Sequence, residues 1–175
     1  MQISFYPNFS RGFTLLEVLI VLFIVSLMTG IVVVSLPSFT QSDYFDRESQ
    51  RIRVLIRMLS EKAVTQSNDY GLQIKRYDGA GVYGYEFFRY DEEYQEWQPL
   101  NESPFRPRKL DFELSLSLRV EGKTFDFFAR GAPPVLMLSS GEMTPFELDI
   151  RQEKKSGLLK TLKTDGYSDV DWLKQ

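Results

Sequence analysis

The feature that most constrains this chain is an apolar run near its N-terminus. From Val18 to Leu36 there are 19 consecutive residues without a charge. At about 1.5 Å of rise per residue, a helix of this length crosses most of a hydrocarbon core about 30 Å thick. The run is longer than the apolar region of a secretory signal peptide, and no small-x-small cleavage site follows it. The sequence therefore predicts one membrane-spanning helix, and Arg11 ahead of it predicts a cytoplasmic N-terminus.

A single carboxylate, Glu17, stands at the head of this run. A charge at membrane depth is costly, so such residues are usually paired and functional. One interpretation is that Glu17 pairs with a positive group of a neighbouring chain. The other interpretation is that its side chain only reaches out to the lipid headgroups.

The residues around Glu17 resemble a known processing motif. The stretch from Arg11 to Glu17, Arg-Gly-Phe-Thr-Leu-Leu-Glu, followed by the apolar run, is similar to the N-terminus of type IV pilins and of type II secretion pseudopilins. The resemblance implies that residues 1–12 are a leader, that the prepilin peptidase cuts between Gly12 and Phe13, and that Phe13 is then N-methylated. It also implies a single-pass protein of the bacterial inner membrane, with residues 13–36 as its transmembrane and assembly helix and its C-terminal domain in the periplasm.

The same resemblance implies a role for Glu17 in assembly. Glu17 becomes the fifth residue of the mature chain, where this family has its glutamate. Cleavage creates an α-amine at Phe13, and the amine and a neighbouring subunit's Glu17 would neutralise each other. An unpaired buried charge costs several kcal/mol, so this pairing would set the axial register of one helix against the next.

The composition limits the classes of function. The 175-residue chain has no cysteine and no histidine. This excludes disulfides, Ser-His-Asp and Cys-His arrangements and the HExxH zinc site. Carboxylate-only chemistry remains open, but no spacing of acidic residues supports it. The net charge of −3 argues against nucleic-acid binding, which is typically basic. We therefore expect no enzymatic activity, no cofactor and no metal.

The residues after the apolar run predict a second helical segment, over 37–66. Pro37 removes a helical hydrogen bond, so we expect a kink there, with Ser42 or Asp43 as a cap if the helix breaks. An apolar stripe at helical spacing then predicts one face packed on a sheet. It comprises Ile52, Leu55, Ile56, Leu59 and Ala63. Another face carries Arg53, Arg57 and Glu61, which are either solvated or in contact with a neighbouring subunit.

From residue 67 to 175 the pattern changes to a period of two, which predicts strands. The expected fold class is α+β: a long N-terminal membrane helix packed on an antiparallel, two-sheet β domain. Residues 167–175 are expected to form a polar tail. Seven or eight strands are expected, near Tyr70–Lys75, Val82–Tyr90, Tyr94–Trp97, Leu110–Val120, Thr124–Phe128, Val135–Leu138, Phe146–Ile150 and Leu158–Lys163.

Later stretches narrow the resemblance to the GspH/FimT branch of the family. They are Arg51 to Ile74, Trp97 to Leu100 and Leu138 to Leu148. This implies a minor pseudopilin of type II secretion, at or near the tip of a periplasmic pseudopilus that helps to export folded proteins. Its implied partners are other pseudopilins, the prepilin peptidase and exported cargo. The alternative is a minor type IV pilin, like FimT or FimU, that acts in pilus assembly or DNA uptake.

Two weaker patterns suggest ligands. Asp165, Ser168, Asp169 and Asp171 resemble a loose calcium loop, although the spacing is not that of an EF-hand. A solvated tail is the simpler interpretation. A basic patch for DNA is the second pattern, against ordinary solvated surface. It would comprise Arg106, Arg108, Lys109, Lys154, Lys155, Lys160 and Lys163.

Overall fold

The computed structural model describes residues 14–35, 41–77, 81–111, 113–125, 127, 131–153 and 157–173. The chain divides into two units, residues 1–40 and residues 41–175. Within its described residues, 14–35, the first unit contains one helix, α1 (Leu15–Ser35). Among the helices of the described residues, none combines the length and the apolar character needed for a transmembrane span. Pro37 lies outside the described residues, and so does any kink there.

The second unit begins with α2 (Gln41–Gln66), an amphipathic helix. The five stripe residues predicted from the sequence are all buried: Ile52, Leu55, Ile56, Leu59 and Ala63. The helix ends at Gln66; the next residue, Ser67, adopts φ 48°, and Asn68 N–H donates to the Ala63 carbonyl at 3.2 Å. A left-handed residue after the last turn is a common way to satisfy the final carbonyls of a helix.

The first sheet takes its strands from both halves of the β domain, because β7 comes late in the chain and pairs with β1. The strand order is β3-β2-β1-β7, and β4 also pairs with β2. All pairings are antiparallel. The strands are β1 (Tyr70–Tyr77), β2 (Val82–Asp91), β3 (Glu96–Pro99), β4 (Arg108–Lys109) and β7 (Val135–Met137).

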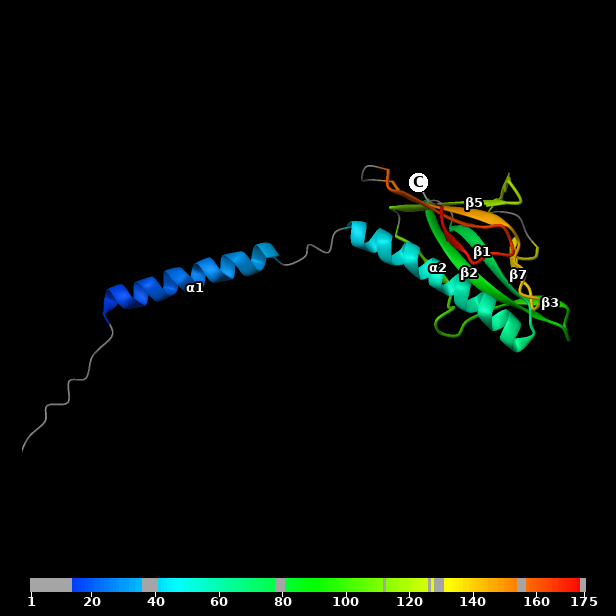
Figure 1. The fold of residues 1–175 in the computed structure, drawn as a ribbon, viewed down its shortest axis with the longest axis horizontal. Helices are drawn as coiled ribbons and strands as arrows, with labels where there is room; N and C mark the ends of the chain where they lie inside the picture. Colours follow the sequence, from blue (N-terminus) through cyan, green and yellow to red (C-terminus); the bar gives the residue numbers. More distant parts are fainter. Residues whose placement is uncertain are drawn as a thin grey trace, which may run out of the picture. The chain divides into compact units, whose positions relative to one another are not determined.

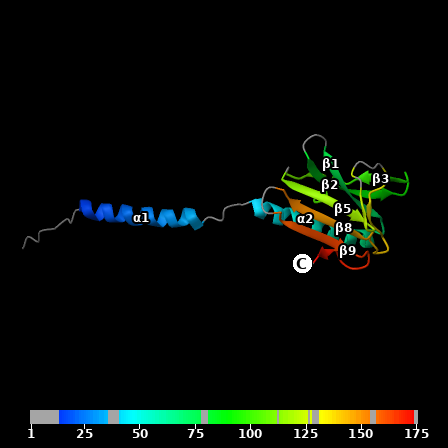
Figure 2. The same ribbon diagram turned by 90° about the horizontal axis from the view of Figure 1, so that it is seen from above.

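The second sheet has the order β10-β9-β8-β5-β6, again antiparallel throughout. Figure 2 shows β5, β8 and β9 as neighbours, and Figure 1 shows α2 alongside β1 and β2. The strands are β5 (Leu114–Val120), β6 (Lys123–Thr124), β8 (Phe146–Gln152), β9 (Leu159–Thr164) and β10 (Asp171–Trp172).

One continuous core joins α2 to both sheets. The alternation predicted for two strands decides which side chains enter it. In β5 the leucines at 114, 116 and 118 are buried, and in β8 so are Phe146, Leu148 and Ile150. The polar residues between them face outward, as the period of two requires. The predicted fold class, a helical N-terminus followed by an antiparallel two-sheet β domain, is confirmed.

Two local predictions were wrong. The strand expected from Leu110 begins only at Leu114, because Leu114 N–H donates to the Asp111 carbonyl at 3.0 Å and closes a turn. The expected polar tail contains β10, whose Leu173 N–H donates to the Thr161 carbonyl at 2.8 Å. Val170, just before β10, is buried. A strand of two residues gives no alternation for sequence reasoning to detect.

Candidate assembly surfaces

Glu17 lies in the first turn of α1, next to the Thr14 N-cap. Its N–H contacts both the carbonyl oxygen of Thr14, at 3.0 Å, and the hydroxyl of Thr14, at 3.2 Å. The side chain of Glu17 is exposed. Among the described residues its carboxylate forms no ion pair. The helix N-terminus favours a negative charge here, but only by about 0.3–1 kcal/mol at an exposed position.

The surface of α1 around Glu17 is apolar on all sides. Every apolar side chain from Leu15 to Met28 is at least 46 % exposed. The hydroxyl of Ser26 donates to the Leu22 carbonyl at 2.8 Å, so this polar group is satisfied within the helix. A helix that is apolar all round needs lipid or other protein to cover it. Gly12 and Phe13, the predicted cleavage and methylation residues, lie outside the described residues.

A partly buried ion pair joins α2 to the first sheet. The Arg108 guanidinium, on β4, donates two hydrogen bonds to Glu48: Nε to Oε2 at 2.8 Å, and Nη2 to Oε1. Glu48 is only 5 % exposed. The hydrogen bond with Glu48 raises the pKa of Arg108 above its usual value. Beside this pair, burial raises the pKa of Tyr85 to about 12, although its hydrogen bond from Arg51 opposes the shift.

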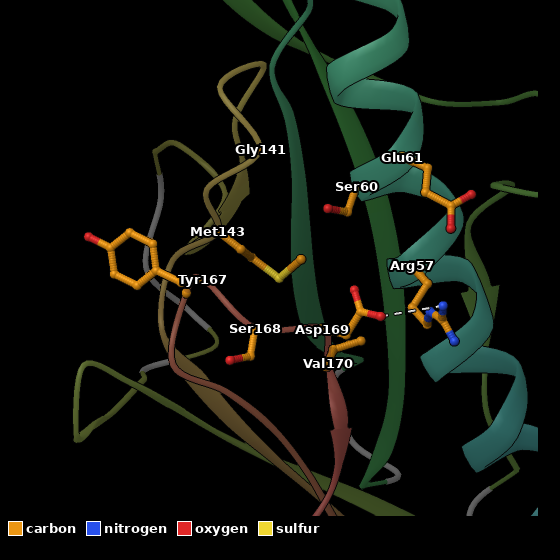
Figure 3. A pocket seen from close by; sticks show the side chains of 10 residues that line it. Arg57, Ser60, Glu61, Gly141, Met143, Tyr167, Ser168, Asp169 and Val170 are labelled. Carbon is orange, nitrogen blue, oxygen red and sulfur yellow. Dashed lines mark ion pairs between the residues drawn. The ribbon is translucent and has the colours of Figure 1, made fainter.

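The acidic tail is held against α2 by arginines. Arg53 pairs with Asp171 at 3.1 Å and Arg57 with Asp169 at 3.4 Å, the second pair being drawn in Figure 3. The pocket in that view, about 60 Å³, is smaller than a binding site for an organic ligand. The Arg57–Asp169 pair is exposed, with side-chain exposures of 44 % and 82 %, so Arg57 is solvated as well as paired within the chain. Contact of this face with a neighbouring subunit stays a prediction.

The tail carboxylates do not converge as a calcium loop would require. Asp165 accepts hydrogen bonds from the backbone N–H groups of Ser168 and Tyr167, and these lower the pKa of its carboxyl. Asp169 and Asp171 bind the two arginines instead. Within the described ranges, no group of three acidic residues is arranged to hold a metal ion.

The residues of the suggested basic patch are also engaged with the chain itself. Arg108 binds Glu48, Lys160 pairs with Asp46 at 2.7 Å, and Lys163 pairs with Glu147 at 2.8 Å. Lys109 lies over the Tyr77 ring at 4.4 Å. Lys154 and Lys155 lie outside the described residues. These contacts favour the interpretation as ordinary surface.

Comparison with known proteins assigns the chain to a family. Residues 7–33 match the family model of the prokaryotic N-terminal methylation motif. Type II secretion system protein H of Pseudomonas aeruginosa is 33 % identical over 165 residues, covering 90 % of this chain and 92 % of the relative. The chain belongs to the type II secretion system protein H family. A second member, from Vibrio cholerae, is 31 % identical and covers 81 % of this chain and 82 % of its own.

Solved structures of this family share the fold. The minor pseudopilin EpsH of the Vibrio cholerae type II secretion system aligns with a TM-score of 0.62 and 20 % identity, covering 77 % of this chain and 98 % of its own. The solution structure of Escherichia coli GspH gives a TM-score of 0.55 at 19 % identity, covering 79 % of this chain and 94 % of its own. Membership of the protein H family confirms the predicted branch, a type II secretion pseudopilin, over the alternative of a minor type IV pilin.

The sequence analysis did not predict the ion pair between Glu48 and Arg108, which joins α2 to β4. Glu48 and Arg108 are 60 positions apart, and neither stands in a motif. Sequence patterns report spacing along one helix or strand, whereas this pair joins two elements. Glu48 alone offered a clue in the sequence: it is a charged residue between apolar positions of an amphipathic helix. A charged residue that is buried usually has a partner of opposite charge.

Proposed function

We propose that this chain is a non-enzymatic minor pseudopilin that is cleaved after Gly12, methylated at Phe13 and assembled through Glu17 into the periplasmic pseudopilus. The observation that carries the proposal is the position of Glu17: one exposed carboxylate at the head of a helix whose apolar side chains from Leu15 to Met28 are all exposed. A protein partner that covers this helix must also supply a group that neutralises the charge of Glu17.

The membrane is the first environment of the mature N-terminus. The proposed span, residues 18–36, carries no charge and ends at Leu36, outside the described residues. In the inner membrane this span would leave Glu17 at the cytoplasmic boundary and the β domain in the periplasm. At the cytoplasmic boundary the Glu17 carboxylate of an unassembled subunit lies at headgroup depth, where water still solvates it and the cost of keeping it charged is small.

Assembly moves Glu17 from headgroups to a protein interface. The mature chain begins at Phe13, four residues before Glu17, so the new α-amine lies close to the same membrane depth. An amine from one subunit and a carboxylate from the next then form an ion pair shielded from water. The pair tolerates only one axial offset between two helices, because any other offset leaves two uncompensated charges.

The remaining parts of the proposal concern the partners. The major pseudopilin and the other minor subunits would surround the N-terminal helix, and the prepilin peptidase would act on the leader. The β domain would lie at or near the filament tip, where it meets other minor subunits and exported proteins. The absence of histidine and cysteine from the whole sequence supports a structural role over a catalytic one.

The test uses the full chain, expressed with the other pseudopilins and the peptidase of one secretion system. We expect the intact mass of the membrane protein to correspond to residues 13–175 plus one methyl group, and the chain to co-purify with the other pseudopilins. Gly12→Leu should leave a full-length precursor, because a bulky side chain replaces the small residue before the cut. Met1 on the functional, filament-associated protein would contradict the proposed processing.

A further inference from the structure

The outer side of α2 carries a groove that the function above does not use. It has a volume of about 630 Å³ and is lined by Asp46, Arg47, Gln50, Arg51, Val54, Leu55, Met58 and Pro104. We call it the α2 groove. Positions 47, 50, 51, 54 and 58 follow helical spacing along one stripe, away from the buried stripe. Val54 and Met58 are each 43 % exposed.

The α2 groove carries a net positive charge, because two arginines and one carboxylate, that of Asp46, line it. Five basic residues lie on α2, and three of them pair with acidic residues elsewhere in the chain: Arg53, Arg57 and Lys62. Arg47 and Arg51 form no ion pair among the described residues, and both line the groove. The two nearby carboxylates do not pair with these arginines, because Asp46 pairs with Lys160 and Glu48 pairs with Arg108.

Arg51 is held in place without being neutralised. Its Nε donates to the Tyr85 hydroxyl at 3.3 Å, and its Nη2 donates to the Pro104 carbonyl at 3.4 Å. Neither acceptor is charged at neutral pH. The Pro104 acceptor is a backbone carbonyl, and burial raises the pKa of Tyr85 to about 12. One end of the groove therefore presents the charges of Arg47 and Arg51, beside an Asp46 that Lys160 neutralises, and the other end has an apolar floor of Val54 and Met58.

We propose that the α2 groove binds an acidic, amphipathic helical segment of another pseudopilin, an inference that rests on the proposed function. From Arg47 to Met58 the stripe covers three turns of helix, or about 16 Å at 1.5 Å per residue. A partner helix of that length places carboxylates against Arg47 and Arg51. Its apolar side chains, one or two turns further along, cover Val54 and Met58. This is recognition of a helix by a groove, with the charges fixing its direction.

A second copy of the same chain fits the α2 groove poorly. Two membrane-anchored copies run parallel, which would set Arg47 and Arg51 of one against the same residues of the other. Like charges facing each other across an interface cost several kcal/mol. Only an antiparallel pair would bring Arg47 to the exposed Glu61, and anchoring of both N-termini in one membrane opposes that arrangement.

Because the chain has no cysteine, a single cysteine can report on the α2 groove. Val54→Cys and Met58→Cys, each labelled with a maleimide that carries a photoreactive group, are illuminated in membranes that contain the other pseudopilins. Val64→Cys is the matched control, since Val64 is 50 % exposed on the same helix but does not line the groove. We expect cross-linked peptides from positions 54 and 58 to come from an acidic helix of one other pseudopilin. Position 64 should give little of this product.

A charge reversal tests the electrostatic part. Arg47→Glu should reduce this cross-link by at least about tenfold, since it replaces attraction by repulsion. Arg47 has no ion pair within the described chain, so the domain should still fold. Changing the facing acid of the partner to Lys should restore the product. Lys123→Glu, at an exposed position of β6, makes the same change in net charge and should have no effect.

Three results would overturn the inference: cross-links to a second copy of this chain, equal products from positions 54 and 64, or no response to Arg47→Glu. The proposed function fails separately. If the unmodified chain does not co-purify with the other pseudopilins, assembly itself is wrong. If it co-purifies and the groove variants behave as the controls do, only the docking site is wrong.

Discussion

Removing the Glu48 carboxylate should destabilise the β domain. In Glu48→Ala, Arg108 loses the acceptor of two hydrogen bonds, and α2 loses its ionic contact with β4. Breaking one half of a fully buried pair costs about 3–5 kcal/mol. The side chain of Arg108 is 38 % exposed, however, so water can solvate much of the orphaned guanidinium. We therefore expect a loss of about 2 kcal/mol, close to that of a charged hydrogen bond.

The assay follows thermal unfolding of the full chain in detergent by tryptophan fluorescence. Both tryptophans, Trp97 and Trp172, lie in the β domain, so the signal reports this domain and not α1. For a unit of this size, 2 kcal/mol corresponds to a fall in Tm of about 8 °C.

The control variant is Glu92→Ala, which removes an exposed carboxylate from the turn between β2 and β3. Its effect should stay within about 0.5 kcal/mol, as for most surface substitutions. If Glu48→Ala unfolds at the same temperature as Glu92→Ala, the Glu48–Arg108 pair does not hold α2 to the sheet, and the reasoning is refuted.

Two further predictions concern the packing and the charges of the β domain. Gly71→Ala should cost about 1–3 kcal/mol by overpacking, since a Cβ at this position would lie 2.5 Å from the Cβ of Pro133; an unchanged urea midpoint would show that the loop around Pro133 yields easily. Hydrogen bonds from Lys163 and Arg119 lower the pKa of Glu147 below its usual 4.5, so its stabilisation is present above about pH 4.5 and is lost as the pH falls through the lowered value. Glu147→Gln should flatten the decline of the urea midpoint with acid, and parallel declines in variant and parent would contradict this.

Periodic patterns allowed much of this fold to be predicted. The spacing of Ile52, Leu55, Ile56, Leu59 and Ala63 predicted the buried face of α2, because a packed helix needs one apolar face. The alternation in β5 and β8 predicted their inward side chains for the corresponding reason. The N-terminal motif predicted the family, since residue types, spacing and the apolar run coincide in few other proteins.

The contacts between elements could not be predicted in this way. Asp169 and Asp171 read as a polar tail or a loose metal loop, yet each pairs with an arginine of α2 that lies more than 100 positions earlier. In the sequence, Arg108 and Lys160 suggested a basic patch, yet each pairs with an acidic residue of α2. A charged residue in a sequence does not show which distant charge will meet it, and that choice separates an internal contact from a binding surface.

The most direct test of the account replaces Glu17 by Gln, which removes the charge and keeps the size of the side chain. The measurement is the intact mass of the variant in membranes, together with its co-purification with the other pseudopilins. We predict normal removal of residues 1–12, because the proposed partner of Glu17 appears only after cleavage. We predict that incorporation falls by about a hundredfold or more, which corresponds to the cost of about 3–5 kcal/mol for breaking one half of a buried pair. Incorporation at the level of the unmodified chain would contradict the account and leave Glu17 as a residue that only meets the lipid headgroups.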